Sequence, residues 1–185
     1  ARAAAVLRRV TDMAGWSATR PSGRPEGWGR GLAYARYKNT GAYCAVVAEV
    51  LAEERVRLLR LWIAADLGRV VDPDGAINQL EGGALQAASW ALCETAQLSP
   101  QRIASNDWTS YPILKFSDMP VVDVGLMPMQ DQPSLGAGEC SSGPTCAAIA
   151  NAIYDALGVR LHAMPFTPEQ VLKALDAAPA TDPTR

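Results

Sequence analysis

The sequence predicts an α+β fold: a mainly antiparallel sheet with helices packed on one face. Three observations lead to this prediction. Apolar and polar residues alternate in consecutive stretches of the first half of the chain, which is typical of strands. A short polar break between two of these stretches has the length of a hairpin turn. Later stretches carry apolar residues at helical spacing, so helices follow the strands along the chain.

The N-terminal elements are a helix, a loop and three strands. Apolar residues recur at helical spacing over residues 1–14, which predicts a short helix. Residues 15–30 are rich in glycine and also hold two prolines, which predicts a loop. The polar residues Glu53, Glu54 and Arg55 predict a hairpin between the second and third strands. The three predicted strands are Gly31–Lys38, Ala42–Ala52 and Val56–Ala65.

A long helix is predicted after the third strand. Asp72 can cap its N-terminus, with Pro73 in the first helical position. The apolar pattern continues to about Glu94. Gly82 and Gly83 lie inside this helix, and each costs about 1 kcal/mol relative to alanine. We expect the close approach of another backbone or of a ligand to offset this cost.

The second half of the chain alternates irregular segments with regular ones. In order, these are an irregular stretch (98–119), a strand (Pro120–Met127), a loop (131–143) and a helix (Pro144–Leu157). Gly158 stands where the C-terminal cap of that helix belongs. Pro165–Pro168 opens a last short helix, and the tail from Ala177 is expected to fray.

The composition is that of an ordinary globular protein. Hydrophobic residues make up 49% and charged residues 19% of the chain, which argues against disorder. The net charge of −2 offers no broad attraction to nucleic acid or to anionic lipid. No apolar run approaches the roughly 20 residues that span a bilayer, so we expect no membrane span. The chain begins at Ala1 without an initiator methionine, which we interpret as a processed or truncated product.

The cysteines predict free thiols rather than a metal site. Cys44, Cys93, Cys140 and Cys146 are scattered without a C-x-x-C pair, and His162 is the single histidine. These residues are too few, at the wrong spacing, for a typical zinc site, and His162 is better explained by a surface or packing role. Free cysteine is among the most buried residue types, so we expect buried or half-buried thiols.

Two segments could carry chemistry. The loop Leu135–Glu139 precedes a helix, where small residues allow close approach and the helix start offers unpaired N–H groups. The segment Asn78–Gly83 places polar side chains beside two glycines. Taken alone, an ordinary loop and a solvated helix face explain these segments better. Capping and turn roles likewise explain Asp66, Asp72 and Asp74 better than cation binding does.

Several motifs, taken in order, resemble a known family. From Gln132 the chain reads QPSLGAGECSSGPTCAAIANAIYDALGVRLHAMPFTPEQVL, and upstream it reads AYCAVVAEV, GRVVDPDGAINQLEGGALQAASWALCE and YPILKFSDMP. From about Gly29 onward it resembles the C-terminal part of the molybdenum-binding subunit of xanthine dehydrogenase/aldehyde oxidase-type hydroxylases. The details are most similar to the isoquinoline 1-oxidoreductase-like branch, in its beta chain. Two departures leave the substrate open: Cys140 stands where many members have proline, and Asp72 where asparagine is usual.

The resemblance implies roles for particular residues. Glu139, in the G-x-G-E loop, matches the catalytic base, which in the family takes a proton from a molybdenum-bound hydroxide before the oxygen attacks an electron-poor carbon. Gln79 matches a helix glutamine that contacts the pterin cofactor. Gly138 and Ser141 are implied to line the same cavity. The resemblance implies no metal ligand from this chain.

The resemblance also implies a division of the chain. Residues 1–28 form an N-terminal helix and loop, residues 29–176 the C-terminal molybdopterin-binding domain, and residues 177–185 a tail. The implied cofactor of the complete enzyme is molybdopterin with molybdenum, in the cytosine dinucleotide form that bacterial relatives generally use. We expect the isolated chain to hold no cofactor and to be inactive, because the family's other cofactor-binding loops come earlier in a longer subunit.

The leading hypothesis is therefore the C-terminal fragment of the large subunit of a molybdenum hydroxylase. Such an enzyme oxidises an N-heterocycle or an aldehyde, with water as the oxygen source. Its expected partners are the rest of the molybdenum subunit, a small subunit with two 2Fe–2S clusters that receives the electrons, and a small-molecule substrate, in the cytoplasm or the periplasm. One alternative is a non-catalytic structural relative that packs against an active subunit. Another is an unrelated binding module whose glycine-rich loop holds phosphate.

Overall fold

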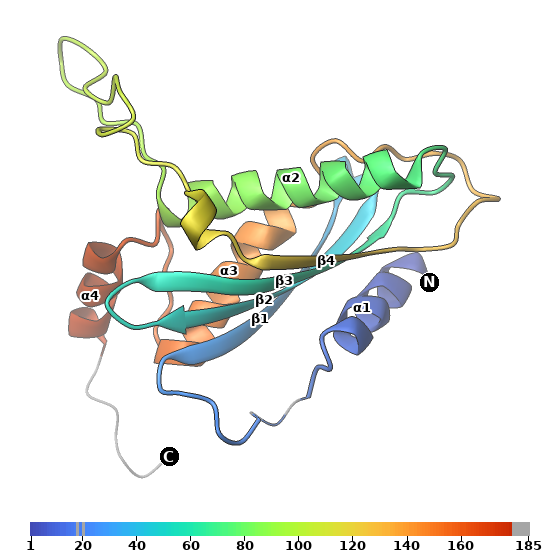
Figure 1. The fold of residues 1–185 in the computed structure, drawn as a ribbon, viewed down its shortest axis with the longest axis horizontal. Helices are drawn as coiled ribbons and strands as arrows, with labels where there is room; N and C mark the ends of the chain where they lie inside the picture. Colours follow the sequence, from blue (N-terminus) through green and yellow to red (C-terminus); the bar gives the residue numbers. More distant parts are fainter. Residues whose placement is uncertain (18, 20, 179–185) are drawn as a thin grey trace.

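The structure, a computed structural model, describes residues 1–17, 19 and 21–178, and these residues form one four-stranded sheet with helices around it. The strands lie in the order β1–β2–β3–β4. They are β1 (Trp28–Arg36), β2 (Tyr43–Ala52), β3 (Val56–Asp66) and β4 (Val121–Leu126). β1 pairs with β2, and β2 with β3, in antiparallel orientation. β4 runs parallel to β3, because the chain returns through a long helix before it forms β4 (Figure 1).

Helices cover the two faces of the sheet unequally. α2 (Pro73–Leu92) and α3 (Ser142–Leu157) lie on one face, whereas α1 (Arg2–Met13) lies on the other (Figure 1). α4 (Pro168–Ala177) lies beside the β2–β3 hairpin. The predicted α+β class with a mainly antiparallel sheet is confirmed. The helix predicted over residues 1–14 forms as α1, but it packs on the face of the sheet for which the sequence predicted no helix.

Most predicted elements are confirmed to within two residues. The Asp72 carboxylate accepts a backbone hydrogen bond of 3.0 Å at the start of α2, where Pro73 takes the first helical position. Gly158, with a φ of 72°, ends α3 in the left-handed conformation. The exception is β1, which begins at Trp28, three residues earlier than predicted. The glycines at positions 29 and 31 suggest a loop in the sequence. In the structure they lie in a strand and allow the backbone of α3 to pack closely against it.

Two predictions concern the organisation of the whole chain. The division into residues 1–28, 29–176 and 177–185 stays a prediction, and the expected fraying from residue 179 onward lies outside the described residues. Within the described part of the chain, no helix has the length and apolar character needed to cross a membrane.

β2 is the centre of the core because it is buried on both faces. Its alternate residues point to opposite sides of the sheet. Toward α2 and α3 they are Cys44, Val46, Ala48 and Val50. Toward α1 they are Ala45 and Val47, which contact the cluster around Val6 and Val10. The continuous apolar run in β2 therefore reflects helices on both faces of the sheet.

β1 and α3 pack with their backbones in direct contact. Gly29 and Gly31 point to the same face of β1, and a Cβ atom on them would lie 2.3 Å from the carbonyl oxygen of Ala152 and 2.1 Å from that of Ala148. These alanines are one helical turn apart, about 6 Å, which matches two residues along a strand. The later glycine meets the earlier alanine, so α3 runs antiparallel to β1. The start of α3 therefore lies beside the end of β1.

Side chains of α3 also satisfy backbone groups at the outer edge of β1. The N–H group of Arg30 donates to Asp155 at 2.9 Å, and the amide of Asn151 donates to the carbonyl oxygen of Leu32 at 2.9 Å. Arg160 holds Asn151 through a further bond of 2.6 Å. The helix thus covers part of an edge whose unpaired groups could otherwise join another strand.

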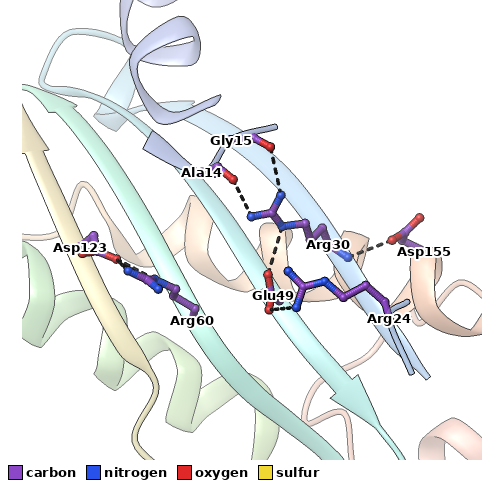
Figure 2. Close-up of polar contacts among 8 residues, drawn as sticks. All are labelled: Ala14, Gly15, Arg24, Arg30, Glu49, Arg60, Asp123 and Asp155. Carbon is purple, nitrogen blue, oxygen red and sulfur yellow. Dashed lines mark hydrogen bonds and ion pairs between the residues drawn. The ribbon is translucent and has the colours of Figure 1, made fainter. Parts of the chain in front are cut away.

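α1 is held to the sheet by a polar network around Arg30 (Figure 2). The Arg30 guanidinium donates to the carbonyl oxygen of Ala14, just beyond the end of α1, at 2.6 Å. It also pairs with the buried Glu49 at 3.2 Å, and Arg24 contacts the same carboxylate at 3.5 Å. A cation at a helix C-terminus meets carbonyl groups without partners in the helix, so the network stabilises this end of α1.

The other end of α1 is attached by an ion pair. The Arg2 guanidinium donates two bonds, of 2.6 and 2.5 Å, to the fully buried carboxylate of Asp66. Burial alone would raise the pKa of Asp66, but the bonds from Arg2 and from the Gly68 N–H outweigh it and lower that pKa. The carboxylate is therefore ionised in the folded protein.

We predict that Gly31→Ala destabilises the chain by about 1–3 kcal/mol, because the added methyl group must displace the α3 backbone. Gly143→Ala is the matched control. It lies in the first turn of α3, where an added Cβ meets nothing within 4 Å. Urea unfolding of the two variants measures the difference. Equal midpoints would contradict the proposed backbone contact.

We also predict that Arg2→Met lowers stability at pH 7 by about 1–3 kcal/mol, because Asp66 then stays buried without its cation. The pKa of Asp66 is depressed in the folded state, so the contribution of the pair is complete above the ordinary pKa of 3.8 and falls as the pH drops through the lower folded value. The difference between wild type and variant should therefore shrink at pH 3.

Urea unfolding at pH 7 and pH 3 tests this dependence. Arg8→Met, at an exposed position of the same helix, is the control. A stability difference that stays constant between the two pH values would rule out the ion pair as its cause.

Candidate active site

The glycine-rich loop that carries Glu139 lies across the N-terminal half of α2. The amide of Gln79 donates to the carbonyl oxygen of Gly138 at 2.9 Å. This bond joins two predicted site residues that are 59 positions apart in the chain. Both lie at the surface of the described structure, so the contact leaves this part of the loop accessible.

Two serines after the loop attach it to the backbone of α2. Ser141 is fully buried, and its hydroxyl donates to the carbonyl oxygen of Leu80 at 3.0 Å. The Ser142 hydroxyl donates to the carbonyl oxygen of Gly83 at 3.5 Å. A Cβ on Gly83 would lie 2.8 Å from the Ser141 hydroxyl, so the group that approaches closely is a side chain and not the predicted backbone or ligand. Gly82 has no such neighbour within 4 Å.

These contacts bear on the cofactor-binding role predicted for Ser141. Its hydroxyl faces α2 and has no exposed surface, so the side chain fixes the loop rather than lining a cavity. Gly138 and Gly143, which flank it in the chain, are exposed. A Cβ on either would meet nothing within 4 Å, so there is open space beside both.

Glu139 is exposed and lies at the wall of a hollow of about 370 Å³. The hydroxyl of Tyr37, in the short turn that follows β1, donates to one oxygen of its carboxylate. The antiparallel packing of β1 against α3 produces this contact, since it brings the end of the strand to the start of the helix. The hollow is also lined by Lys38, Trp90, Ser142, Gly143 and Pro144.

A second hollow of about 380 Å³ lies on the other side of the loop. Gln79, Gly136 and Ala137 line it, together with Asp72 at the start of α2. Gln79 and Glu139 therefore border different hollows, with Gly138 between them. The structure brings together the predicted residues Gln79, Gly138 and Glu139 along one loop but does not place them in one cavity.

Two thiols lie behind Glu139. Cys140 and Cys44 are both buried in the main core. A hydrogen bond with Cys140, and secondly burial, raises the pKa of Cys44, so it stays protonated. Cys93 and Cys146 are half-buried, and the prediction of buried or half-buried free thiols is confirmed. In the described residues, no group of three or more histidine, cysteine or acidic side chains could hold a metal ion.

The residues around Glu139 suit a polar or anionic group. Ser141, at the N-cap of α3, makes no side-chain capping bond, and the first turn of the helix holds no acidic residue. Backbone N–H groups at a helix start attract negative charge. Here the Ser142 N–H already donates to the carbonyl oxygen of Glu139 at 3.2 Å and Pro144 has no N–H, so Gly143 carries the N–H group that could meet a ligand. With the open space beside Gly138 and Gly143, this geometry fits a pterin cofactor that carries phosphate groups.

The sequence did not identify Tyr37, Lys38 or Trp90 as neighbours of Glu139. They come from the β1–β2 connection and from α2, about 100 and 50 residues before the loop. Their place depends on the packing of α3 against β1 and α2. The glycines at alternate positions in β1 were the available signal, because they allow a helix to pack closely against that strand.

A family model and the similar proteins of known name point to the same family. The family model of the molybdopterin cofactor-binding domain matches residues 6–120. The chain is 39% identical over 188 residues to the B chain of nicotinate dehydrogenase from Pseudomonas putida, covering 94% of this chain and 16% of that protein. It is 35% identical over 170 residues to the beta chain of isoquinoline 1-oxidoreductase from Brevundimonas diminuta, covering 90% and 21%.

A solved structure agrees with these relatives. The fold is similar to that of aldehyde oxidoreductase from Desulfovibrio gigas, with a TM-score of 0.64 and 28% identity, over 75% of this chain and 16% of that one. The chain spans about a fifth or less of the length of these relatives. The resemblance seen in the sequence motifs is confirmed, and the chain belongs to the molybdopterin-binding subunits of the xanthine dehydrogenase/aldehyde oxidase family.

Proposed function

We propose that this chain is the C-terminal part of the large subunit of a molybdenum hydroxylase that oxidises an N-heterocycle or an aldehyde, with Glu139 as its catalytic base. The observation that carries this proposal is the position of Glu139. It lies exposed in a hollow at the start of α3, with a tyrosine hydroxyl on one carboxylate oxygen. The names of the relatives, which include a nicotinate dehydrogenase and an isoquinoline oxidoreductase, support this substrate range.

The geometry suits a residue that accepts a proton. A general base must be reachable and held in one orientation. Tyr37 donates to one carboxylate oxygen of Glu139, and the residue lines the hollow. The Ser141–Leu80 bond holds the loop against α2, so the carboxylate is attached to two rigid elements. Such preorganisation lowers the cost of reaching the reactive geometry.

The cofactor would be molybdopterin, which when bound supplies the molybdenum that delivers oxygen derived from water and takes two electrons from the substrate. The Gln79 amide and the backbone at Gly138 would hold it. Ser141 would act only through the position of the loop. We infer the cytosine dinucleotide form, and electron transfer to a small subunit with two 2Fe–2S clusters, in the cytoplasm or the periplasm.

The second candidate function is a non-catalytic relative that packs against an active subunit. The chain spans only part of its relatives, which is compatible with this alternative. The contact between Tyr37 and Glu139 favours the catalytic role, because a purely structural loop has no need of an oriented, exposed carboxylate. An unrelated phosphate-binding module is not supported, since the chain belongs to the molybdopterin-binding family.

In the assembled enzyme, Glu139→Gln is expected to abolish turnover while the molybdenum content persists. The amide keeps the shape of the side chain but cannot accept the proton. Turnover and bound molybdenum are measured on the same preparation. Glu169→Gln, at the exposed start of α4, is the control and should keep wild-type turnover. Substantial residual turnover in Glu139→Gln would exclude its role as the base.

Tyr37→Phe is expected to lower kcat about tenfold and to leave KM nearly unchanged, because the carboxylate keeps its charge but loses its orientation. Tyr111→Phe is a matched control, since Tyr111 donates to Glu94 at 2.8 Å away from the hollow. Steady-state kinetics of both variants measure the effect. An unchanged kcat in Tyr37→Phe, or an equal loss in the control, would contradict the positioning role.

A further inference from the structure

We propose that the hollow beside Glu139 binds an aromatic carboxylate, with Lys38 as the cation that pairs with its carboxylate group and Trp90 as the surface on which its ring stacks. This inference rests on the proposed function, because it names the class of substrate on which Glu139 acts. It is carried by three features of the hollow: a strained connection, a cation that forms no ion pair within the described part of the chain, and an exposed indole ring.

The connection between β1 and β2 holds Lys38 at the hollow in an uncommon conformation. Lys38 and Asn39 have φ angles of 48° and 61°, in the left-handed region that residues other than glycine seldom adopt. The turn is closed by two bonds, from the Tyr37 N–H to the carbonyl oxygen of Ala42 (2.9 Å) and from the Gly41 N–H to that of Tyr37 (2.8 Å). Strain of this kind is concentrated at functional sites, where it fixes the direction of a side chain.

Lys38 brings a positive charge to the hollow. Among the described residues it forms no ion pair, and its ammonium group lies 5.1 Å from the centre of the Tyr37 ring. The Tyr37 hydroxyl contacts Glu139, so the same tyrosine touches the cation with its ring and the carboxylate with its hydroxyl. A substrate carboxylate next to Lys38 would gain an ion pair and avoid the repulsion that it would meet beside Glu139.

The other cation near the hollow is already engaged. The Arg36 guanidinium donates to the carbonyl oxygen of Thr40 at 3.3 Å and stacks on Tyr43, 4.7 Å from the ring centre. Arg36 therefore fixes the end of β1, and Lys38 is the cation available to a ligand.

Trp90, in α2, supplies an apolar wall of the hollow that carries Lys38. It projects from α2, and 39% of its surface is exposed although it lines the hollow. Pro144 and Ala35 extend this wall. The volume of about 370 Å³ lies within the usual range for small-molecule pockets. A flat ring on Trp90 would gain stacking and burial, while the lysine sets the position of its charged group.

Binding of two probes that differ only in charge tests the assignment. Pyridine-3-carboxylate and pyridine-3-carboxamide share a ring, and their affinities for the resting assembled enzyme can be measured by calorimetry. We expect the wild type to prefer the carboxylate. Lys38→Met should weaken carboxylate binding about five- to tenfold and carboxamide binding by less than about twofold, and Lys38→Arg should restore the preference. Trp90→Leu should weaken both probes about tenfold.

Lys115→Met, an exposed lysine outside the hollow, is the control and should change neither affinity. The inference is overturned if the wild type does not bind the carboxylate, if it shows no preference, or if Lys38→Met weakens both probes equally. Binding by Glu139→Gln separates this inference from the proposed function. A preserved preference with full turnover would reject the base but keep the lysine site. Lost turnover without any preference for the carboxylate would support Glu139 as the base but reject the lysine site.

Discussion

The contact between the glycines of β1 and the alanines of α3 determines where the rest of the site lies. Because neither surface carries a bulky side chain, the helix rests directly on the strand and its repeat matches that of the strand. The antiparallel direction of the pair places the start of α3 beside the end of β1. The oriented carboxylate of Glu139 and the cation of Lys38 both follow from this arrangement.

α2 provides the second support. Its glycine at position 83 admits the Ser141 hydroxyl, and its glutamine at position 79 holds the loop backbone. The helix therefore tolerates a residue of low helical propensity in return for a fixed loop. The loop forms a ridge between two hollows, one bordered by Gln79 and one by Glu139. A cofactor and a substrate could thus meet the same few residues from opposite sides.

The sequence predicts the elements better than their arrangement. Alternating residues in β2 and β3, and the Asp72–Pro73 helix start, are local patterns, and the structure bears them out. The parallel pairing of β4 and the position of α1 depend on tertiary contacts such as Arg2–Asp66, which no local pattern encodes. Motif resemblance predicts the loop of Glu139. No local pattern predicts Tyr37, because its role depends on how β1 and α3 pack together.

The bonds from Asn151 and Asp155 to the edge of β1 have a consequence for assembly. A strand from elsewhere could extend this sheet at β1 only by displacing α3 side chains from the Arg30 N–H and the Leu32 carbonyl group. At the opposite end of the sheet, β4 pairs with β3 on one side only among the described residues. Growth of the sheet is therefore directional. Any segment that continues it in a larger subunit is favoured to join along β4, far from the edge that α3 covers.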